Sequence, residues 1–207
     1  MIQLSLLNRA ALDLGVEIST STSDVRPLRH AWSMRAFKAF AAIDFETANQ
    51  CPESACAVGI VRVENGRVTA RESRLLRPPE NHFSFSDIHG ITWGCVAEAP
   101  TFAEAWPALA SLLSGIEFIA AHNACFDRSV LAACCDAARL LMPPAPFLCT
   151  VRLARQTWGI FPTALPAVCR RLRIPLRHHD ALSDAEASAR IVMMAGDSAF
   201  RPFLTLK

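Results

Sequence analysis

The stretch Ala41-Ala42-Ile43-Asp44-Phe45-Glu46-Thr47 decides how this chain is interpreted, because it places two acids at the end of a short apolar run. Side chains alternate between the two faces of a β-strand, so Asp44 and Glu46 are expected on one face. Two adjacent carboxylates repel each other unless a cation accompanies them, and their oxygens suit Mg²⁺ or Mn²⁺. Taken alone, the pair fits a strand edge with solvated acids better, because short motifs often match by accident.

The size and composition favour one globular domain with an appendage. The chain has 207 residues, of which 52% are hydrophobic, and a formal net charge of +2. It can therefore bury a full core, and it is not expected to be disordered. Its eight cysteines include no Cys-x-x-Cys pair, which favours reduced core thiols in a cytoplasmic protein. No apolar stretch is long enough to span a bilayer, and a signal peptide is not expected.

Patterning begins only near residue 37 and ends near residue 195, where we place the main domain. Residues 1–36, with a Ser/Thr run at 19–23, are expected to form a loosely ordered extension. Met34 stands directly before the patterned region, which makes it a candidate natural start of translation. Residues 196–207 are expected to form a short tail.

The hydrophobic pattern predicts five strands, with helices between and after the last of them. Strands are expected over residues 37–45, 57–63, 67–75, 116–121 and 147–150. Helices are expected over residues 101–114, 126–140, 151–158, 164–172 and 183–195. Asn65-Gly66 predicts a hairpin between the second and third strands. This order predicts an α/β fold whose mixed sheet carries a hairpin at one side and is covered by helices.

Two further acids lie in related positions, and a histidine accompanies the second. Asp127 follows a predicted buried strand, in the first turn of a helix, and Asp184 lies in the first turn of the last helix. The helix dipole stabilises an acid there, so each also fits a simple helix-start role. His179 precedes Asp184 by five residues, and a histidine near neutral pKa can take a proton from water. Without further context, a histidine in a basic loop is more often solvated.

In combination, these segments resemble the motifs of the DEDDh (DnaQ-like) 3′–5′ exonuclease superfamily, which includes the proofreading epsilon subunit of bacterial DNA polymerase III. The matching segments are Asp44-Phe45-Glu46-Thr47, His122-Asn123-Ala124-Cys125-Phe126-Asp127 and His179-x4-Asp184, and Ile88-His89-Gly90-Ile91-Thr92 is similar to another family segment. The chain has no tyrosine, which excludes the family branch with tyrosine in the last motif. Ala48-Asn49 stands where many members have Thr-Gly, which puts nearby substrate contacts in doubt.

The resemblance implies a ribonuclease H-like fold, with a mixed five-stranded sheet flanked by helices. It implies hydrolysis of phosphodiester bonds in DNA or RNA from the 3′ end, with release of 5′-mononucleotides. Asp44, Glu46, Asp127 and Asp184 would hold two Mg²⁺ or Mn²⁺ ions, about 4 Å apart, which stabilise the attacking and leaving oxygens. His179 would deprotonate the attacking water, because the motif spacing favours it over the adjacent His178.

Four positions are implied as substrate contacts. The backbone around Phe45 and Thr47 would approach the terminal nucleotide, whereas the Phe45 side chain is expected in the core. His89 would meet the terminal nucleotide or the scissile phosphate, and Asn123 would orient its loop. Each of the last two fits a purely structural role equally well.

A basic block precedes His179. Residues 150–179 contain no Asp or Glu. The same stretch holds six arginines: Arg152, Arg155, Arg170, Arg171, Arg173 and Arg177. Such a block suits a phosphate backbone, although an ordinary basic helix face fits as well.

The main prediction is an exonuclease acting on single-stranded or frayed 3′ ends. One alternative is a catalytically silent module that binds nucleic acid or a polymerase, and another is a ribonuclease H-like endonuclease. The intact set of four acids and one histidine favours the enzyme. A DNA polymerase subunit and a second copy of the chain are further predicted partners.

Overall fold

The computed structural model describes residues 37–196 of the chain. The expected extension over residues 1–36, the candidate start at Met34 and the tail from residue 197 lie outside the described residues. No helix within residues 37–196 is long and apolar enough to cross a membrane.

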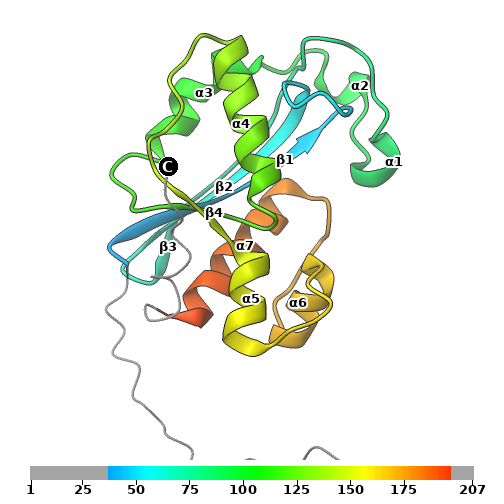
Figure 1. Ribbon diagram of the computed structural model, residues 1–207. Helices are drawn as coiled ribbons and strands as arrows, with labels where there is room; N and C mark the ends of the chain where they lie inside the picture. The colour runs from blue at the N-terminus through cyan, green and yellow to red at the C-terminus, as the bar shows by residue number, and fades with distance from the viewer. Residues whose placement is uncertain (1–36, 197–207) are drawn as a thin grey trace, which may run out of the picture. The chain divides into compact units, whose positions relative to one another are not determined.

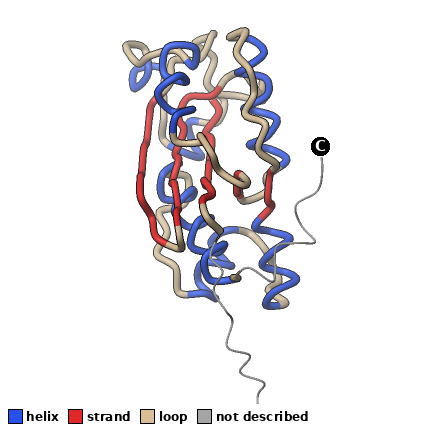
Figure 2. Tube along the Cα trace, turned by 90° about the vertical axis from the view of Figure 1, so that its left-hand side faces the viewer, coloured by secondary structure: helices blue, strands red, loops and turns tan. Residues whose placement is uncertain are grey.

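Five strands form one mixed sheet in the order β3-β2-β1-β4-β5 (Figure 1). They are β1 (Ala39–Thr47), β2 (Ala55–Glu64), β3 (Arg67–Leu75), β4 (Ile119–Ala121) and β5 (Phe147–Cys149). The first three pair antiparallel, whereas β4 and β5 continue the sheet parallel to β1. Figure 2 shows the strands running alongside one another, with the shorter pair beside the longer hairpin. The predicted mixed five-stranded sheet is confirmed.

The Asn65-Gly66 turn joins β2 and β3 as predicted. Both residues have positive φ, 50° for Asn65 and 73° for Gly66. A two-residue turn with this backbone matches the twist of the strands it connects, and Asn and Gly adopt it at low cost. The turn therefore sets the register of the hairpin from a local signal.

Helices cover both faces of the sheet, α3 and α4 on one and α5, α6 and α7 on the other (Figure 1). The helices are α1 (Ser86–His89), α2 (Trp93–Val96), α3 (Phe102–Ser111), α4 (Cys125–Ala137), α5 (Thr150–Trp158), α6 (Leu165–Leu172) and α7 (Ala181–Ala195). Sequence patterning misses α1 and α2 because each is a single turn, too short to show a helical period. The other five were predicted, with boundaries that differ by a few residues.

Strand β1 lies between two hydrophobic cores, because its successive side chains point to opposite faces of the sheet. Ala41, Ile43 and Phe45 pack under α3 and α4. Phe40 and Ala42 pack with α5, α6 and α7. Continuation of this alternation places Asp44 and Glu46 on the side that α7 covers.

Helices α5 and α7 both begin earlier than predicted. Thr150, expected at the end of a strand, begins α5 and is fully buried, with its hydroxyl bonded to the carbonyl of Ala121. Helix α7 begins at Ala181 rather than Ser183, because the Asp180 side chain accepts a hydrogen bond from the Ser183 N–H and caps the helix.

Candidate active site

Close packing of α7 against β2 brings Asp184 to the two acids of β1. Gly59 pairs with Asp44 across the sheet. A Cβ on Gly59 would collide with the backbone carbonyl of Ala181, the first residue of α7. Only glycine therefore allows this approach. As a result, Asp44, Glu46 and Asp184 can each offer an oxygen within 4.8 Å of the others.

Asp127, which is distant from Asp44 and Glu46 in the sequence, joins these acids from α4. It lies in the first turn of α4, just after β4 ends, and is only 1% exposed. Its Oδ1 accepts a hydrogen bond of 3.0 Å from the Phe45 N–H, a residue 82 positions away. This bond ties α4 to β1 between Asp44 and Glu46. The Asp127 Oδ2 atom is buried without a hydrogen-bond partner among the described residues.

Two histidines converge on Asp184. The His178 Nδ1 lies 2.8 Å from the Asp184 Oδ2, and the His179 backbone N–H donates to the same oxygen at 3.1 Å. The second oxygen of Asp184 is buried with no partner in the described part of the chain. The two imidazole rings stack, with centroids 3.8 Å apart.

His179 adopts a left-handed backbone conformation, with φ of 67°. Histidine is enriched among the non-glycine residues found there, but the conformation still costs free energy. It directs the N–H of His179 to Asp184 while the side chain remains half-buried. Burial, followed by the neighbouring His178, lowers the pKa of His179, which favours the neutral ring that a base requires.

Burial raises the pKa of all four carboxyl groups, and repulsion from neighbouring carboxylates adds to it for Asp44, Glu46 and Asp127. Burial, together with repulsion from the Asp184 carboxylate, raises the pKa of Glu46 to about 7 and that of Asp127 to about 8. Asp44 keeps some solvent contact, yet burial of its carboxyl and repulsion from Asp127 raise its pKa strongly. Burial also raises the pKa of Asp184. Such a cluster is unfavourable when ionised without a nearby cation.

This donor set fits divalent metal ions. The unpartnered oxygens of Asp127 and Asp184 are buried acceptors, and a buried acceptor without a partner costs free energy. Hard carboxylate oxygens are the ligands that Mg²⁺ and Mn²⁺ prefer. Asp44, Glu46 and Asp184 are close enough to hold one divalent cation, and His179 lies beside Asp184. Asp127 lies near these acids and is bonded to the Phe45 N–H.

The four residues predicted to contact substrate take different positions. Phe45 is buried in the core under α3 and α4, and its N–H is bonded to Asp127. The Thr47 carbonyl accepts a hydrogen bond from the His89 Nε2 at 3.1 Å, while the His89 Nδ1 accepts from the Ile91 N–H. Asn123 is exposed in a turn with φ of 64°. His89 thus links β1 to the segment after α1, whether or not it also meets substrate.

Sequence reasoning missed a second group of polar contacts, which surrounds His122 in the turn between β4 and α4. The His122 ring lies 2.8 Å from the Thr150 hydroxyl and 2.8 Å from the Thr163 carbonyl. Arg155 also bonds the Thr163 hydroxyl, at 3.0 Å. These bonds link the start of α5 and the loop before α6 to the turn that precedes Asp127. His122 belongs to a quoted motif, but no local pattern indicates its partners.

Comparison with known proteins decides the family. A family model described as exonuclease, RNase_T, matches residues 41–192, which is most of the chain. The chain belongs to the DEDDh, DnaQ-like superfamily of 3′–5′ exonucleases. The resemblance read from the motifs is thereby confirmed, and so is the predicted ribonuclease H-like fold.

The relatives of this exonuclease domain are longer proteins that the chain matches in part. The PolC-type DNA polymerase III of Thermotoga petrophila is 29% identical over 178 residues, which cover 83% of this chain and 13% of that protein. Exodeoxyribonuclease 10 of Escherichia coli K12 is 31% identical over 144 residues, or 66% of this chain and 59% of that protein. The structure of Exonuclease X in complex with 5′-overhanging duplex DNA is 27% identical, with a TM-score of 0.60 over 75% of this chain and 90% of that chain.

The chain therefore spans a small part of the polymerase relatives and less than two thirds of exodeoxyribonuclease 10. Membership in this exonuclease family implies divalent metal ions, and the acidic cluster described above is the group of residues that could bind them.

Proposed function

We propose that this protein is a metal-dependent 3′–5′ exonuclease that hydrolyses phosphodiester bonds and releases 5′-mononucleotides. One observation carries the proposal. Four buried or half-buried carboxyl groups from β1, α4 and α7 meet beside His179, and two of their oxygens lack partners among the described residues. Their mutual repulsion is a stability cost with no structural benefit, and metal binding explains it.

In the proposed reaction, Asp44, Glu46, Asp127 and Asp184 hold two Mg²⁺ or Mn²⁺ ions. When bound, such ions supply Lewis-acid stabilisation of the attacking and leaving oxygens. His179 accepts a proton from water, the water oxygen bonds to phosphorus, and the bond from phosphorus to the 3′ oxygen of the preceding nucleotide breaks. That oxygen takes a proton from solvent and becomes the new 3′ hydroxyl of the shortened strand. The hydrogen bond from the His179 N–H to Asp184 holds the base beside the acids while its ring stays free to take the proton.

DNA is the substrate that the relatives favour. One relative is named an exodeoxyribonuclease, and one solved neighbour is bound to 5′-overhanging duplex DNA. We propose single-stranded or frayed 3′ ends as the preferred form, because a paired end must first be unpaired at a cost of a few kcal/mol. RNA is the alternative substrate to be compared directly.

The PolC-type relatives support a place in DNA replication or repair. A DNA polymerase subunit and a second copy of this chain are accordingly proposed as partners. Light scattering during size-exclusion chromatography measures whether two copies of the chain associate. A mass that stays at one chain over a tenfold concentration range would exclude a stable homodimer.

The deciding experiment is a nuclease assay on matched 3′-labelled and 5′-labelled DNA and RNA oligomers, with Mg²⁺ or Mn²⁺. We expect mononucleotide release from the 3′ end, lost in Asp44→Ala and reduced at least 100-fold in His179→Ala. Asp136→Ala and His82→Ala are matched controls, because both residues are exposed and lie outside the acidic cluster. Internal cuts would indicate an endonuclease, and no release from any folded, metal-loaded sample would favour the silent binding module.

His178→Ala separates the two neighbouring histidines. Its ring contacts Asp184 directly, so its removal is expected to change metal binding more than the proton transfer. We expect His178→Ala to retain more activity at saturating metal than His179→Ala. The reverse order would assign the base to His178.

A further inference from the structure

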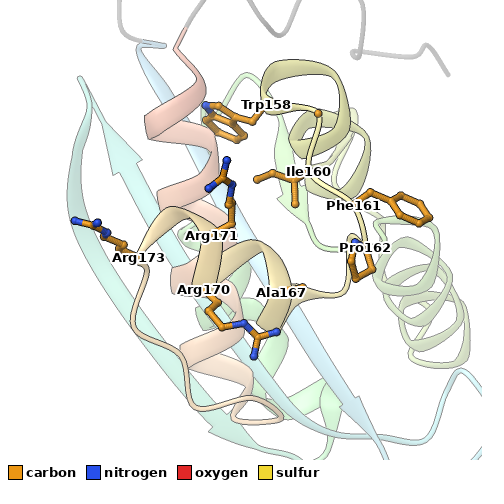
Figure 3. Close-up of a pocket in the computed structure, with 9 residues that line it drawn as sticks. Trp158, Ile160, Phe161, Pro162, Ala167, Arg170, Arg171 and Arg173 are labelled. Carbon is orange, nitrogen blue, oxygen red and sulfur yellow. The ribbon is translucent and has the colours of Figure 1, made fainter.

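A basic pocket with aromatic walls lies outside the acidic cluster. It occupies about 540 Å³ between the end of α5, the loop that follows and α6. Trp158 and Phe161 contribute aromatic rings, and Arg170, Arg171 and Arg173 contribute guanidinium groups (Figure 3). This volume is within the range of sites that hold small ligands or single nucleotides.

The arginines of this pocket carry positive charge that no ion pair in the described part of the chain neutralises. The ion pairs formed within residues 37–196 leave Arg170, Arg171 and Arg173 out. All three are exposed. Two lie in the last turn of α6, where a cation stabilises the helix dipole. That role needs no aromatic neighbours and no cavity, so it does not explain the pocket.

Phe161 is the unusual member of the site. Its side chain is 82% exposed, and Figure 3 shows it pointing outward from the loop. The Arg155 guanidinium lies 5.7 Å from the centroid of its ring and is held there by its bond to the Thr163 hydroxyl. An exposed aromatic ring with a guanidinium beside it can stack on a base. Arg170 and Arg171, which line the same pocket, can bind phosphates.

The pocket is connected to residues of the catalytic centre by one hydrogen bond and by a short stretch of chain. Thr163, in the loop that lines the pocket, accepts a hydrogen bond from His122, which begins the segment leading to Asp127. On the other side, Arg173 lies six residues before His179. The segments that line the pocket therefore continue directly into those that carry Asp127 and His179.

We propose that this pocket binds an unpaired nucleotide of the substrate outside the catalytic centre. In this arrangement Arg170 and Arg171 contact backbone phosphates, and Phe161 stacks on a base. The inference rests on the proposed function only for the identity of the ligand, a nucleic acid. The nucleotide comes either from the strand being degraded or from the unpaired end of the opposite strand.

Binding of the full-length, Mg²⁺-loaded protein to fluorescent oligomers with phosphorothioate 3′ linkages tests the proposal without turnover. For Phe161→Ala we expect binding about 5- to 150-fold weaker. For Arg170→Gln/Arg171→Gln, the slope of log affinity against log salt should fall by about 1.4 on a single strand. Arg67→Gln/Arg139→Gln removes two exposed charges elsewhere and should leave affinity and slope near wild type.

The form of the oligomer identifies the source of the nucleotide. A loss confined to single strands longer than a few nucleotides assigns it to the degraded strand. A loss confined to duplexes with a 5′ overhang assigns it to the opposite strand. Wild-type affinity and salt slope in both pocket variants, or an equal slope change in the control variant, would overturn the proposal. So would tighter binding of a hexaglutamate peptide than of any oligomer, lost in the same variants, because it would assign the pocket to an acidic protein segment.

Hydrolysis distinguishes failure of this inference from failure of the proposed function. The p-nitrophenyl ester of thymidine 5′-monophosphate can fill only the catalytic centre, whereas a 20-nucleotide strand can reach the pocket as well. We expect the ratio of kcat/KM for the strand to kcat/KM for the ester to fall at least fivefold in both pocket variants. An unchanged ratio with intact turnover overturns the pocket alone. If the pocket variants lose binding while the wild-type protein hydrolyses neither substrate, the proposed function alone is overturned.

Discussion

Replacement of Asp127 by Asn should stabilise the metal-free protein while it destroys the proposed activity. The Asp127 carboxyl is buried beside other acids, and its pKa is raised from 3.8 to about 8. In the unfolded chain the ordinary pKa returns, so the folded state holds this proton to higher pH. The free energy of unfolding therefore falls as pH rises between about 4 and 8. The Asn variant, which keeps an oxygen for the Phe45 N–H, lacks this decline.

The size of the effect follows from the pKa difference. About 4 pKa units at about 1.4 kcal/mol each set an upper limit of about 6 kcal/mol at pH 8. Repulsion is shared among Glu46, Asp184 and Asp127, and protonation of one group relieves the others. We therefore expect about 2 kcal/mol, which corresponds to a rise in Tm of about 4–8 °C for a domain of this size.

Thermal unfolding in EDTA at pH 5 and pH 8 measures this effect. Asp127→Asn should melt well above wild type at pH 8, and the gap should shrink at pH 5. Asp136→Asn, an exposed acid on the same helix, is the control and should show no pH-dependent gap. A variant that melts at or below wild type at pH 8, or a gap that does not depend on pH, would refute the reasoning.

Other predictions concern the packing at Gly59, the binding of Mg²⁺ and the hydrogen bonds of His122. Gly59→Ala should lower the free energy of unfolding by about 1–3 kcal/mol and reduce activity, because α7 must move away from β2. Gly94→Ala is the control for the comparison of Tm and rate, because its new Cβ meets no close neighbour. Mg²⁺ should raise the Tm of wild type at pH 8 more than that of Asp127→Asn, and equal shifts would place the ion elsewhere. His122→Ala removes two hydrogen bonds, including that to Thr163, and should lower the free energy of unfolding in urea by about 2 kcal/mol. A loss below about 0.5 kcal/mol would show that solvent replaces these bonds.

Most of the fold was predictable because its signals are local. The alternation in β1, the Asn65-Gly66 turn and the capping box of α3 each depend on a few neighbouring residues, and the structure contains all three. The single-turn helices α1 and α2 and the true starts of α5 and α7 were not predictable. The first two are too short to show a helical period. The start of α7 depends on the Asp180 cap, and Thr150 at the start of α5 is buried through a contact with Ala121, which is distant in sequence.

By itself, the sequence determined the order of the elements, the face of β1 that carries Asp44 and Glu46, and membership in the exonuclease superfamily. Those properties follow from the two-residue period of a strand and from the spacing of motifs along the chain. The tertiary structure alone decided which distant groups meet. Packing of α7 against Gly59 and the bond from the Phe45 N–H to Asp127, across 82 residues, assemble the four acids. Their raised pKa values arise because that packing excludes water from carboxylates that no local pattern places together.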